Sequence, residues 1–183
     1  HRVQTLDELI GVGESLSAQL RAITHSDENI EQQRALIATL RERATKQVEQ
    51  LHALREKASL DMSQGVEQML KSLGMPEARF VVEVESLGGL TPMGGDAIRF
   101  MFSANSRIAP QPVEKIASGG EVSRVMLALK ALLAAKSKLP TIIFDEIDTG
   151  VSGRIADAMG DIISSLGENM QVVAITHLPQ VAS

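Results

Sequence analysis

The first 75 residues carry apolar side chains at helical spacing, and no proline occurs before Pro76. Thr5 and Glu8 have the spacing of a capping box, in which each side chain accepts a hydrogen bond from the other residue's backbone N–H group. Ser26, followed by two acidic residues, indicates a second helix start, because a hydroxyl cap and early acids satisfy exposed N–H groups. This pattern predicts a helical segment over residues 1–75.

Beyond Ser26 the apolar positions of this segment recur every seven residues. One position of the repeat is occupied by Ile30, Ile37, Ala44, Leu51 and Ala58, and the complementary position by Leu40 and Leu54. Charges of both signs fill the remaining faces, which is typical of a coiled-coil strand. A solvated helix that packs only on its own domain is the alternative. A coiled coil implies a partner helix.

Pro76 and the glycine before it end the helical pattern. Residues 79–86 and 97–105 then have the composition of strands, and the glycine-rich residues 87–96 between them predict a long hairpin or an edge loop. Two later apolar runs, within residues 139–148 and 170–177, lack alternation and therefore predict strands buried on both faces. A helix over residues 152–166 lies between these two runs and ends at Gly167.

Strand, helix and strand over this length predict a βαβ unit with a parallel sheet. We therefore expect an α/β fold with a helical arm over residues 1–75 and a lobe over residues 76–183. Since the chain begins without methionine and stops shortly after the last predicted strand, we also expect it to be a fragment.

Composition narrows the possible functions. The net charge of −5, the absence of Trp and Tyr and the presence of only four Phe argue against direct nucleic-acid binding by this chain. No apolar run approaches the roughly 20 residues that span a bilayer, so no membrane partner is expected. The N-terminus lacks a signal-peptide layout and the chain has no cysteine, so we expect a cytoplasmic location.

Ionisable and hydroxyl side chains cluster where the two predicted buried strands end: Asp145, Glu146, Asp148, Thr176 and His177. Ligands of doubly wound sheets gather at the carboxyl ends of the strands. A strand that ends in Asp-Glu predicts a nucleotide site, with Asp145 serving Mg²⁺ and Glu146 activating a water molecule. His177 is a candidate for contacting a terminal phosphate. Polar strand ends that only cap their loops are the structural alternative.

The turn "SGGE", Ser118–Glu121, precedes a predicted apolar helix. Ser118 and Glu121 alone could form a capping box. Gly119 and Gly120 are not needed for a cap, but they would let backbone N–H groups reach an anion at the positive end of the helix. The chain nevertheless contains no Gly-x-x-x-x-Gly-Lys-Ser/Thr phosphate loop.

Taken together, "SGGE", "IIFDEID" and "VVAITH" resemble, in order and spacing, the second lobe of an ABC-type (P-loop NTPase) ATPase head. Within that superfamily "ASGGEVSR", "FDEIDTGVSG" and "THLPQVA" are similar to the RecN family of bacterial DNA repair ATPases, which are relatives of the SMC proteins. The similarity is close over residues 115–183. The preceding helical segment and two strands fit a coiled-coil arm that returns into a C-terminal lobe.

This resemblance implies an ATP site shared between two heads in an ATP-dependent homodimer. Ser118, Gly119, Gly120 and Glu121 would form the signature turn, which closes over the γ-phosphate of ATP held by another chain. In the chain's own site, Asp145 would serve Mg²⁺, Glu146 would be the general base and His177 the switch residue. The phosphate loop would lie in the chain's own N-terminal ATPase lobe, upstream of the arm. That lobe and an antiparallel coiled-coil strand would be partners of this chain, and DNA would be bound by the full-length, nucleoid-associated protein.

Three other functions compete with this interpretation. A helicase-type ATPase would account for "DEID", but it would predict neither the signature turn nor the heptad arm. A non-catalytic coiled-coil interaction module would leave the Asp145–Glu146 pair unexplained. A metal-dependent phosphoesterase built on Asp145, Asp148 and His177 would leave the double glycine unexplained. For the fragment by itself we predict no ATPase activity.

Overall fold

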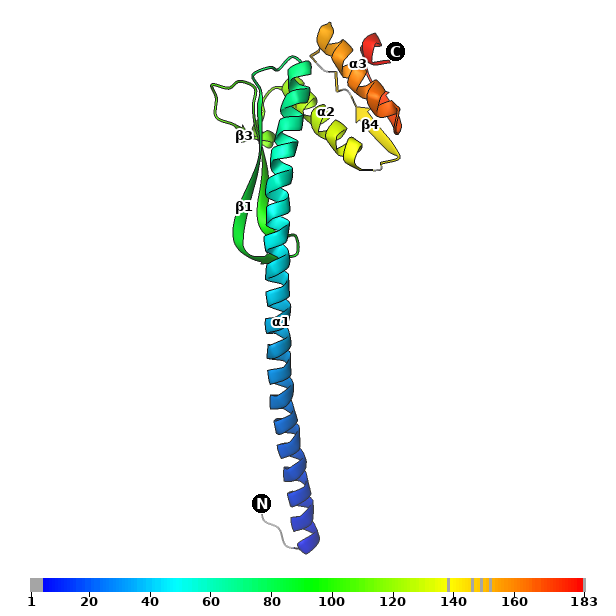
Figure 1. The fold of residues 1–183 in the computed structure, drawn as a ribbon. Helices are drawn as coiled ribbons and strands as arrows, with labels where there is room; N and C mark the ends of the chain where they lie inside the picture. Colours follow the sequence, from blue (N-terminus) through cyan, green and yellow to red (C-terminus); the bar gives the residue numbers. More distant parts are fainter. Residues whose placement is uncertain (1–4, 138, 146, 149, 152, 183) are drawn as a thin grey trace. The chain divides into compact units, whose positions relative to one another are not determined.

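The computed structural model describes residues 5–182 apart from 138, 146, 149 and 152, and for residues 24–28 and 135 it describes only the backbone. The chain divides into two compact units, His1–Gln50 and Leu51–Ser183. Helix α1 (Leu6–Ser72) forms the first unit and continues into the second (Figure 1). The predicted functional division between an arm of residues 1–75 and a lobe of residues 76–183 stays a prediction.

The start of α1 confirms the predicted capping box. The Thr5 N–H donates to Glu8 Oε2 and the Glu8 N–H donates to Thr5 Oγ1, both at 3.3 Å. The predicted second helix start at Ser26 is wrong, because the backbone is helical on both sides of that residue. A local capping signal is weak compared with the tendency of a long helix to propagate, which adds a hydrogen bond with each residue.

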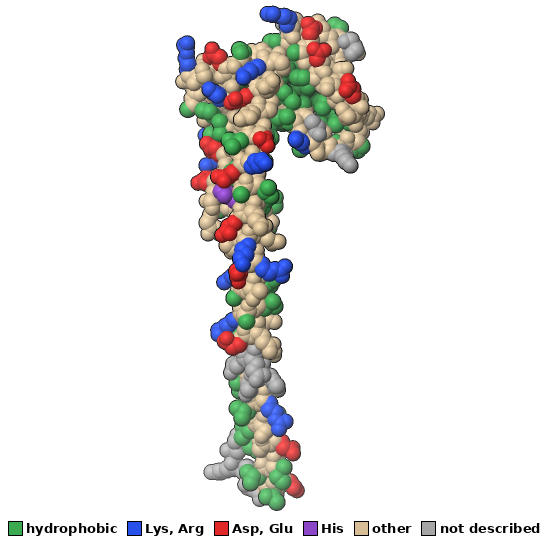
Figure 2. All heavy atoms as spheres, in the orientation of Figure 1, with side chains coloured by type: hydrophobic (Ala, Val, Ile, Leu, Met, Phe, Trp, Pro, Cys, Tyr) green, Lys and Arg blue, Asp and Glu red, His purple; other side chains and the backbone are tan. Residues whose placement is uncertain are grey.

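The surface of α1 in the first unit alternates between exposed apolar and charged side chains (Figure 2). Pairs one turn apart bring together Arg34 with Glu31 at 2.7 Å and Lys46 with Glu42 at 2.8 Å. The exposed apolar residues of this part include Leu6, Leu9, Ile10, Leu16, Ile23, Ile30, Leu36, Ile37 and Leu40. This is the surface that the predicted partner strand would cover.

An antiparallel hairpin follows α1 in the second unit. Strands β1 (Arg79–Thr91) and β2 (Gly94–Ser103) pair from Arg79 opposite Ser103 to Ser86 opposite Asp96, and β3 (Gln111–Pro112) pairs with β2. The hairpin prediction is confirmed, but the glycine-rich segment is mostly strand and not a long loop. The chain reverses within two residues, because the Thr91 hydroxyl donates to the Gly94 carbonyl at 2.6 Å and Gly94 has a φ of +105°.

A βαβ unit ends the chain, as predicted. Strands β4 (Thr141–Asp145) and β5 (Gln171–Ile175) pair in parallel, from Thr141 opposite Gln171 to Asp145 opposite Ile175. The intervening helix begins at Arg154 and ends at Gly167, so its C-terminal stop was predicted correctly. The elements that follow β3 are η1 (Val113–Lys115), α2 (Gly119–Lys136), β4 (Thr141–Asp145), α3 (Arg154–Gly167), β5 (Gln171–Ile175) and α4 (Pro179–Ala182).

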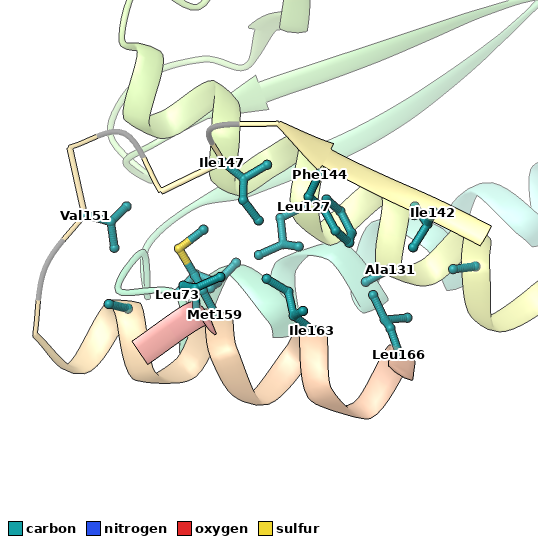
Figure 3. Packing of buried hydrophobic residues seen from close by; sticks show 13 residues of the cluster. Leu73, Leu127, Ala131, Ile142, Phe144, Ile147, Val151, Met159, Ile163 and Leu166 are labelled. Atoms are coloured by element: carbon teal, nitrogen blue, oxygen red, sulfur yellow. The ribbon is translucent and has the colours of Figure 1, made fainter. Parts of the chain in front are cut away.

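Helix α2 contributes to two hydrophobic clusters. Its Leu127 and Ala131 pack with β4 and α3, and Figure 3 shows this cluster: Leu73, Leu127, Ala131, Ile142, Phe144, Ile147, Val151, Met159, Ile163 and Leu166. Its Val125 and Ala128 pack with the end of α1 and with the hairpin, in a second cluster that includes Val66, Leu70, Phe80 and Phe102. The helix that begins with the signature turn is thereby fixed on both the hairpin and the βαβ unit.

The prediction that β4 and β5 are buried on both faces is wrong for this chain. Ile142 and Phe144 are buried against α2 and α3, whereas Ile143, Val173 and Ile175 are exposed by 59%, 41% and 52%. The reason is that α2 and α3 cover one face of this two-stranded sheet, and the described part of the chain leaves these three side chains on the other face uncovered. An apolar sheet face of this kind is usually an interface.

Candidate functional site

The turn Ser118–Glu121 opens α2 without a side-chain cap. Ser118 is the N-cap residue and its carbonyl accepts from the Val122 N–H at 3.0 Å, but its side chain makes no cap hydrogen bond. The contrast with Thr5 and Glu8, which do form the reciprocal bonds, shows that the capping-box interpretation of this turn is not realised. The Ser118 side chain is exposed.

Packing within this chain does not explain the glycine at position 119. A Cβ built on Gly119 would have no heavy atom within 4 Å, so an alanine would fit in the isolated chain. Glycine is less favourable than alanine in helices by up to about 1 kcal/mol. A glycine at this position leaves the backbone of the helix N-terminus without a side chain, and unpaired N–H groups and the helix dipole at such an end favour an anion.

Arg124 anchors this first turn to the end of α1. Its Nε donates to the Gly120 carbonyl at 2.9 Å and its Nη1 donates to the Leu73 carbonyl at 3.3 Å. The next residue, Gly74, has a φ of +80°, and a Cβ there would lie 2.7 Å from Ile155 Cδ1 on α3. The end of α1, the Ser118–Glu121 turn and α3 are thus packed together. Sequence reasoning missed Arg124, whose only signal was its place one turn after Gly120.

The parallel register of β4 and β5 brings the predicted site residues to one edge of the sheet. Asp145 is the last residue of β4 and pairs with Ile175, so Thr176 and His177 leave β5 at the same edge. Asp145 and His177 are both exposed. Glu146, the predicted general base, lies outside the described residues.

Among the predicted site residues that the structure describes, Asp148 differs from the others because it is buried. Its Oδ2 accepts hydrogen bonds from the Thr176 hydroxyl at 2.6 Å, the His177 N–H at 2.9 Å and the Leu178 N–H at 3.1 Å. Burial by itself would raise the pKa of Asp148, but these hydrogen bonds outweigh burial and hold the pKa below its usual range. The convergence of the two strand ends was predicted, but the bonds that join them were not.

A second buried carboxylate, Asp96, joins the hairpin to α1. Arg55 Nη1 donates to its Oδ2 at 2.9 Å, and His52 Nδ1 lies 2.7 Å from its Oδ1. Arg55 also donates to the Met93 carbonyl at the hairpin turn, at 2.8 Å. The pKa of Asp96 is lowered chiefly by the Arg55 hydrogen bond, against the opposing effect of burial. The cluster fixes the tip of the hairpin on the helix.

Within the described residues, no group of three or more His, Cys, Asp or Glu side chains could enclose a metal ion. Mg²⁺ is commonly held by one or two carboxylates together with water and phosphate oxygens, and the Mg²⁺ site at Asp145 stays a prediction. Asp145 has the position and exposure for that role.

No helix in the described part of the chain is long and apolar enough to cross a membrane.

Comparison with solved structures defines the class of fold. One similar structure is the Smc head domain of Pyrococcus yayanosii, which includes a coiled coil and joint. It superposes on this chain with a TM-score of 0.55 and 18% identity, covering 96% of this chain and 29% of that one. An SMC head bound to the C-winged helix domain of ScpA gives a TM-score of 0.54 and 18% identity, covering 69% and 37%. The chain therefore has the α/β fold of the C-terminal lobe of an ABC-type head with its helical arm.

Comparison with curated sequences identifies the family. The chain is 37% identical over 187 aligned residues to DNA repair protein RecN of Haemophilus influenzae, covering all of this chain and 33% of that relative. It is 35% identical over 177 residues to RecN of Vibrio cholerae, covering 96% and 32%. No protein-family profile matches the chain. The chain belongs to the RecN family, and it spans about a third of the length of the curated relatives it matches.

Proposed function

We propose that this chain is the C-terminal part of the ATPase head of a RecN-type DNA repair protein, and that it supplies half of each of two ATP sites. To its own head it gives Asp145, Glu146 and His177, and to a second head it gives the signature turn Ser118–Glu121. The observation that carries the proposal is the parallel register of β4 and β5, which sets Asp145 and the turn after β5 at one sheet edge. Membership of the RecN family is consistent with this proposal.

Each residue has a role that follows from its chemistry and position. Asp145 would hold Mg²⁺, which when bound neutralises charge on the β- and γ-phosphates. Glu146, the next residue in the chain, would accept a proton from the attacking water. His177, which follows the neighbouring strand β5 at the same sheet edge, would donate a hydrogen bond to the γ-phosphate. These are positioning and charge-stabilising roles, which supply most of the catalysis in phosphoryl transfer.

The open face of the β4–β5 sheet supports a lobe supplied by another part of the parent protein. Ile143, Val173 and Ile175 form an apolar face that the described residues leave exposed. The relatives are about three times as long as this chain, so the parent has polypeptide to cover it. That N-terminal lobe would also supply the phosphate loop, and we therefore expect the fragment to lack ATPase activity by itself.

A second head is supported by the signature turn. Within the described residues, the Cβ position of Gly119 lies in open space and the Ser118 side chain makes no cap hydrogen bond, so both positions are available to a second head. A structural neighbour with a TM-score of 0.50 and 18% identity comes from work on ATP-driven dimerization and DNA-stimulated activation of SMC ATPases. By analogy, two heads would close on two ATP molecules, and the full-length protein would bind DNA in the cytoplasm.

The exposed apolar stripe of α1 supports an antiparallel coiled-coil partner from the same parent chain. Ile30, Ile37 and Leu40 keep the heptad spacing and are all exposed. A helix of this length with an exposed apolar seam gains stability when a partner strand covers it. The arm would connect the head to the rest of the parent protein.

The test is made on the full-length parent protein. We expect Glu146→Gln to abolish ATP hydrolysis while ATP-dependent pairing of heads persists, because the substitution removes the base but keeps the size of the side chain. Glu168→Gln, at an exposed position after α3, is the matched control and should behave as the wild type. Wild-type turnover in Glu146→Gln would contradict the proposal.

A further inference from the structure

The buried carboxylate of Asp148 joins the two turns that carry the proposed catalytic side chains. Asp148 lies two residues after Glu146, in the turn that follows β4. Its Oδ2 is held 2.6 Å from Thr176 Oγ1, 2.9 Å from the His177 nitrogen and 3.1 Å from the Leu178 nitrogen. One oxygen atom thereby accepts three hydrogen bonds from the turn that follows β5, which lies almost thirty residues later in the chain.

These bonds fix the backbone of the His177 turn while its side chain stays exposed. The carboxylate binds the N–H groups of His177 and Leu178, so it determines where the peptide that carries the imidazole lies relative to the end of β4. The Thr176 hydroxyl also accepts from the Leu178 N–H at 3.0 Å, which closes a small network. Hydrogen bonds to an ionised acceptor are about twice as strong as neutral ones, so this geometry is well determined.

The other oxygen of Asp148 indicates that the charge serves more than local folding. Asp148 Oδ1 is buried and has no hydrogen-bond partner among the residues that the structure describes. A buried polar atom without a partner is unfavourable, and a buried carboxylate more so than a neutral group. An asparagine or a threonine would fill a purely structural role with less charge to bury.

We propose that Asp148 is a positioning residue that sets the switch histidine, His177, against the catalytic end of β4. This inference rests on the proposed function, since it assumes that His177 contacts the γ-phosphate. In this role Asp148 would make no contact with the nucleotide itself. It acts by holding the His177 peptide, so that the imidazole meets the phosphate when the two heads close.

The experiment compares variants of the full-length protein in steady-state ATP hydrolysis. Asp148→Asn removes the charge. Thr176→Val keeps the size of the side chain but removes the hydroxyl that donates to Asp148 and accepts from the Leu178 N–H. We expect kcat to fall by about tenfold to a hundredfold in Asp148→Asn, with the KM for ATP and ATP-dependent head pairing changed by less than about twofold. Thr176→Ser, which keeps the hydroxyl, should recover most of the kcat that Thr176→Val loses. Asp161→Asn, at an exposed position of α3, is the matched control.

A double substitution separates positioning from general support of the fold. If Asp148 acts through His177, then Asp148→Asn combined with His177→Ala should be no slower than His177→Ala alone. Losses that multiply in the double variant, or a wild-type kcat in Asp148→Asn, would overturn the inference. If Asp148→Asn does not fold, Thr176→Val decides: a lowered kcat supports positioning, and an unchanged kcat overturns it.

The same data distinguish this inference from the function on which it rests. Full turnover in His177→Ala would remove the assigned role of the switch histidine, and with it the basis for the inference. A slow His177→Ala together with a fully active Asp148→Asn would leave the proposed function intact and refute the positioning role alone.

Discussion

Replacing Gly119 with alanine adds one methyl group to the exposed first turn of α2. A Cβ at this position has no heavy atom within 4 Å, and Gly119 is not among the residues with positive φ. Alanine is favoured over glycine in a helix by up to about 1 kcal/mol. We therefore expect the free energy of unfolding of the full-length protein to stay the same or to rise by at most about 1 kcal/mol.

The same methyl group would stand where the proposed signature turn meets the γ-phosphate of the partner head. It would hold the backbone N–H groups away from the phosphate. Loss of one preorganised donor to developing charge typically lowers kcat by about 10²–10³-fold. We expect at least a tenfold loss of ATP turnover and weaker ATP-dependent pairing, measured by steady-state hydrolysis and by sedimentation with ATP.

Gly74→Ala makes the same chemical change at a position where the fold itself requires glycine. Gly74 has a φ of +80°, and its added Cβ would lie 2.7 Å from Ile155 Cδ1. A left-handed conformation costs a residue with a Cβ about 1–2 kcal/mol, and Ile155 must also shift. We expect a loss of about 1–3 kcal/mol in urea unfolding. The reasoning is refuted if Gly119→Ala is destabilised like Gly74→Ala, or if it hydrolyses ATP at the wild-type rate.

Three further substitutions test other parts of the structure. Asp96→Asn should lower the urea midpoint at pH 7. The fold lowers the pKa of Asp96, so the stability that its carboxylate contributes is fully present above the unfolded carboxyl's pKa of about 4 and is lost as the pH falls through the lower folded pKa. The urea midpoints of the variant and the wild type should therefore converge in acid. Arg124→Ala removes the hydrogen bonds to the Gly120 and Leu73 carbonyls and should cost about 1–2 kcal/mol of stability by urea unfolding, whereas no change would show that the link is dispensable. Ile175→Glu in the full-length protein should lower the Tm strongly, because the proposed N-terminal lobe would cover that face, and tolerance of the charge would contradict the docking of that lobe.

Local signals predicted the individual elements well. The Thr5–Glu8 capping box, the helix stop at Gly167 and the parallel βαβ unit each depend on residues close in sequence or on a well-established topological rule. Ser26 shows the limit of such signals. Its cap composition did not interrupt a helix whose propagation is favoured at every residue.

The contacts between residues far apart in the sequence could be found only from the structure. The bonds between Asp148 and the Thr176 turn depend on the register of two strands, and nothing in the local sequence of either turn indicates them. The apolar run around Ile143 predicted burial on both faces, but the described residues cover only one. In the proposed head, the N-terminal lobe would cover the other face, and the run would then be buried on both faces as its pattern predicts.

The most direct test of a shared ATP site is complementation between two inactive full-length variants. Gly119→Ala disables the signature turn, and Glu146→Gln disables the base. In a mixed dimer, one site combines an intact base from the first chain with an intact signature turn from the second. The account predicts that a 1:1 mixture recovers up to about a quarter of wild-type ATP turnover, since about half of the dimers are mixed and each has one intact site. No recovery beyond the sum of the separate variants would contradict the shared site.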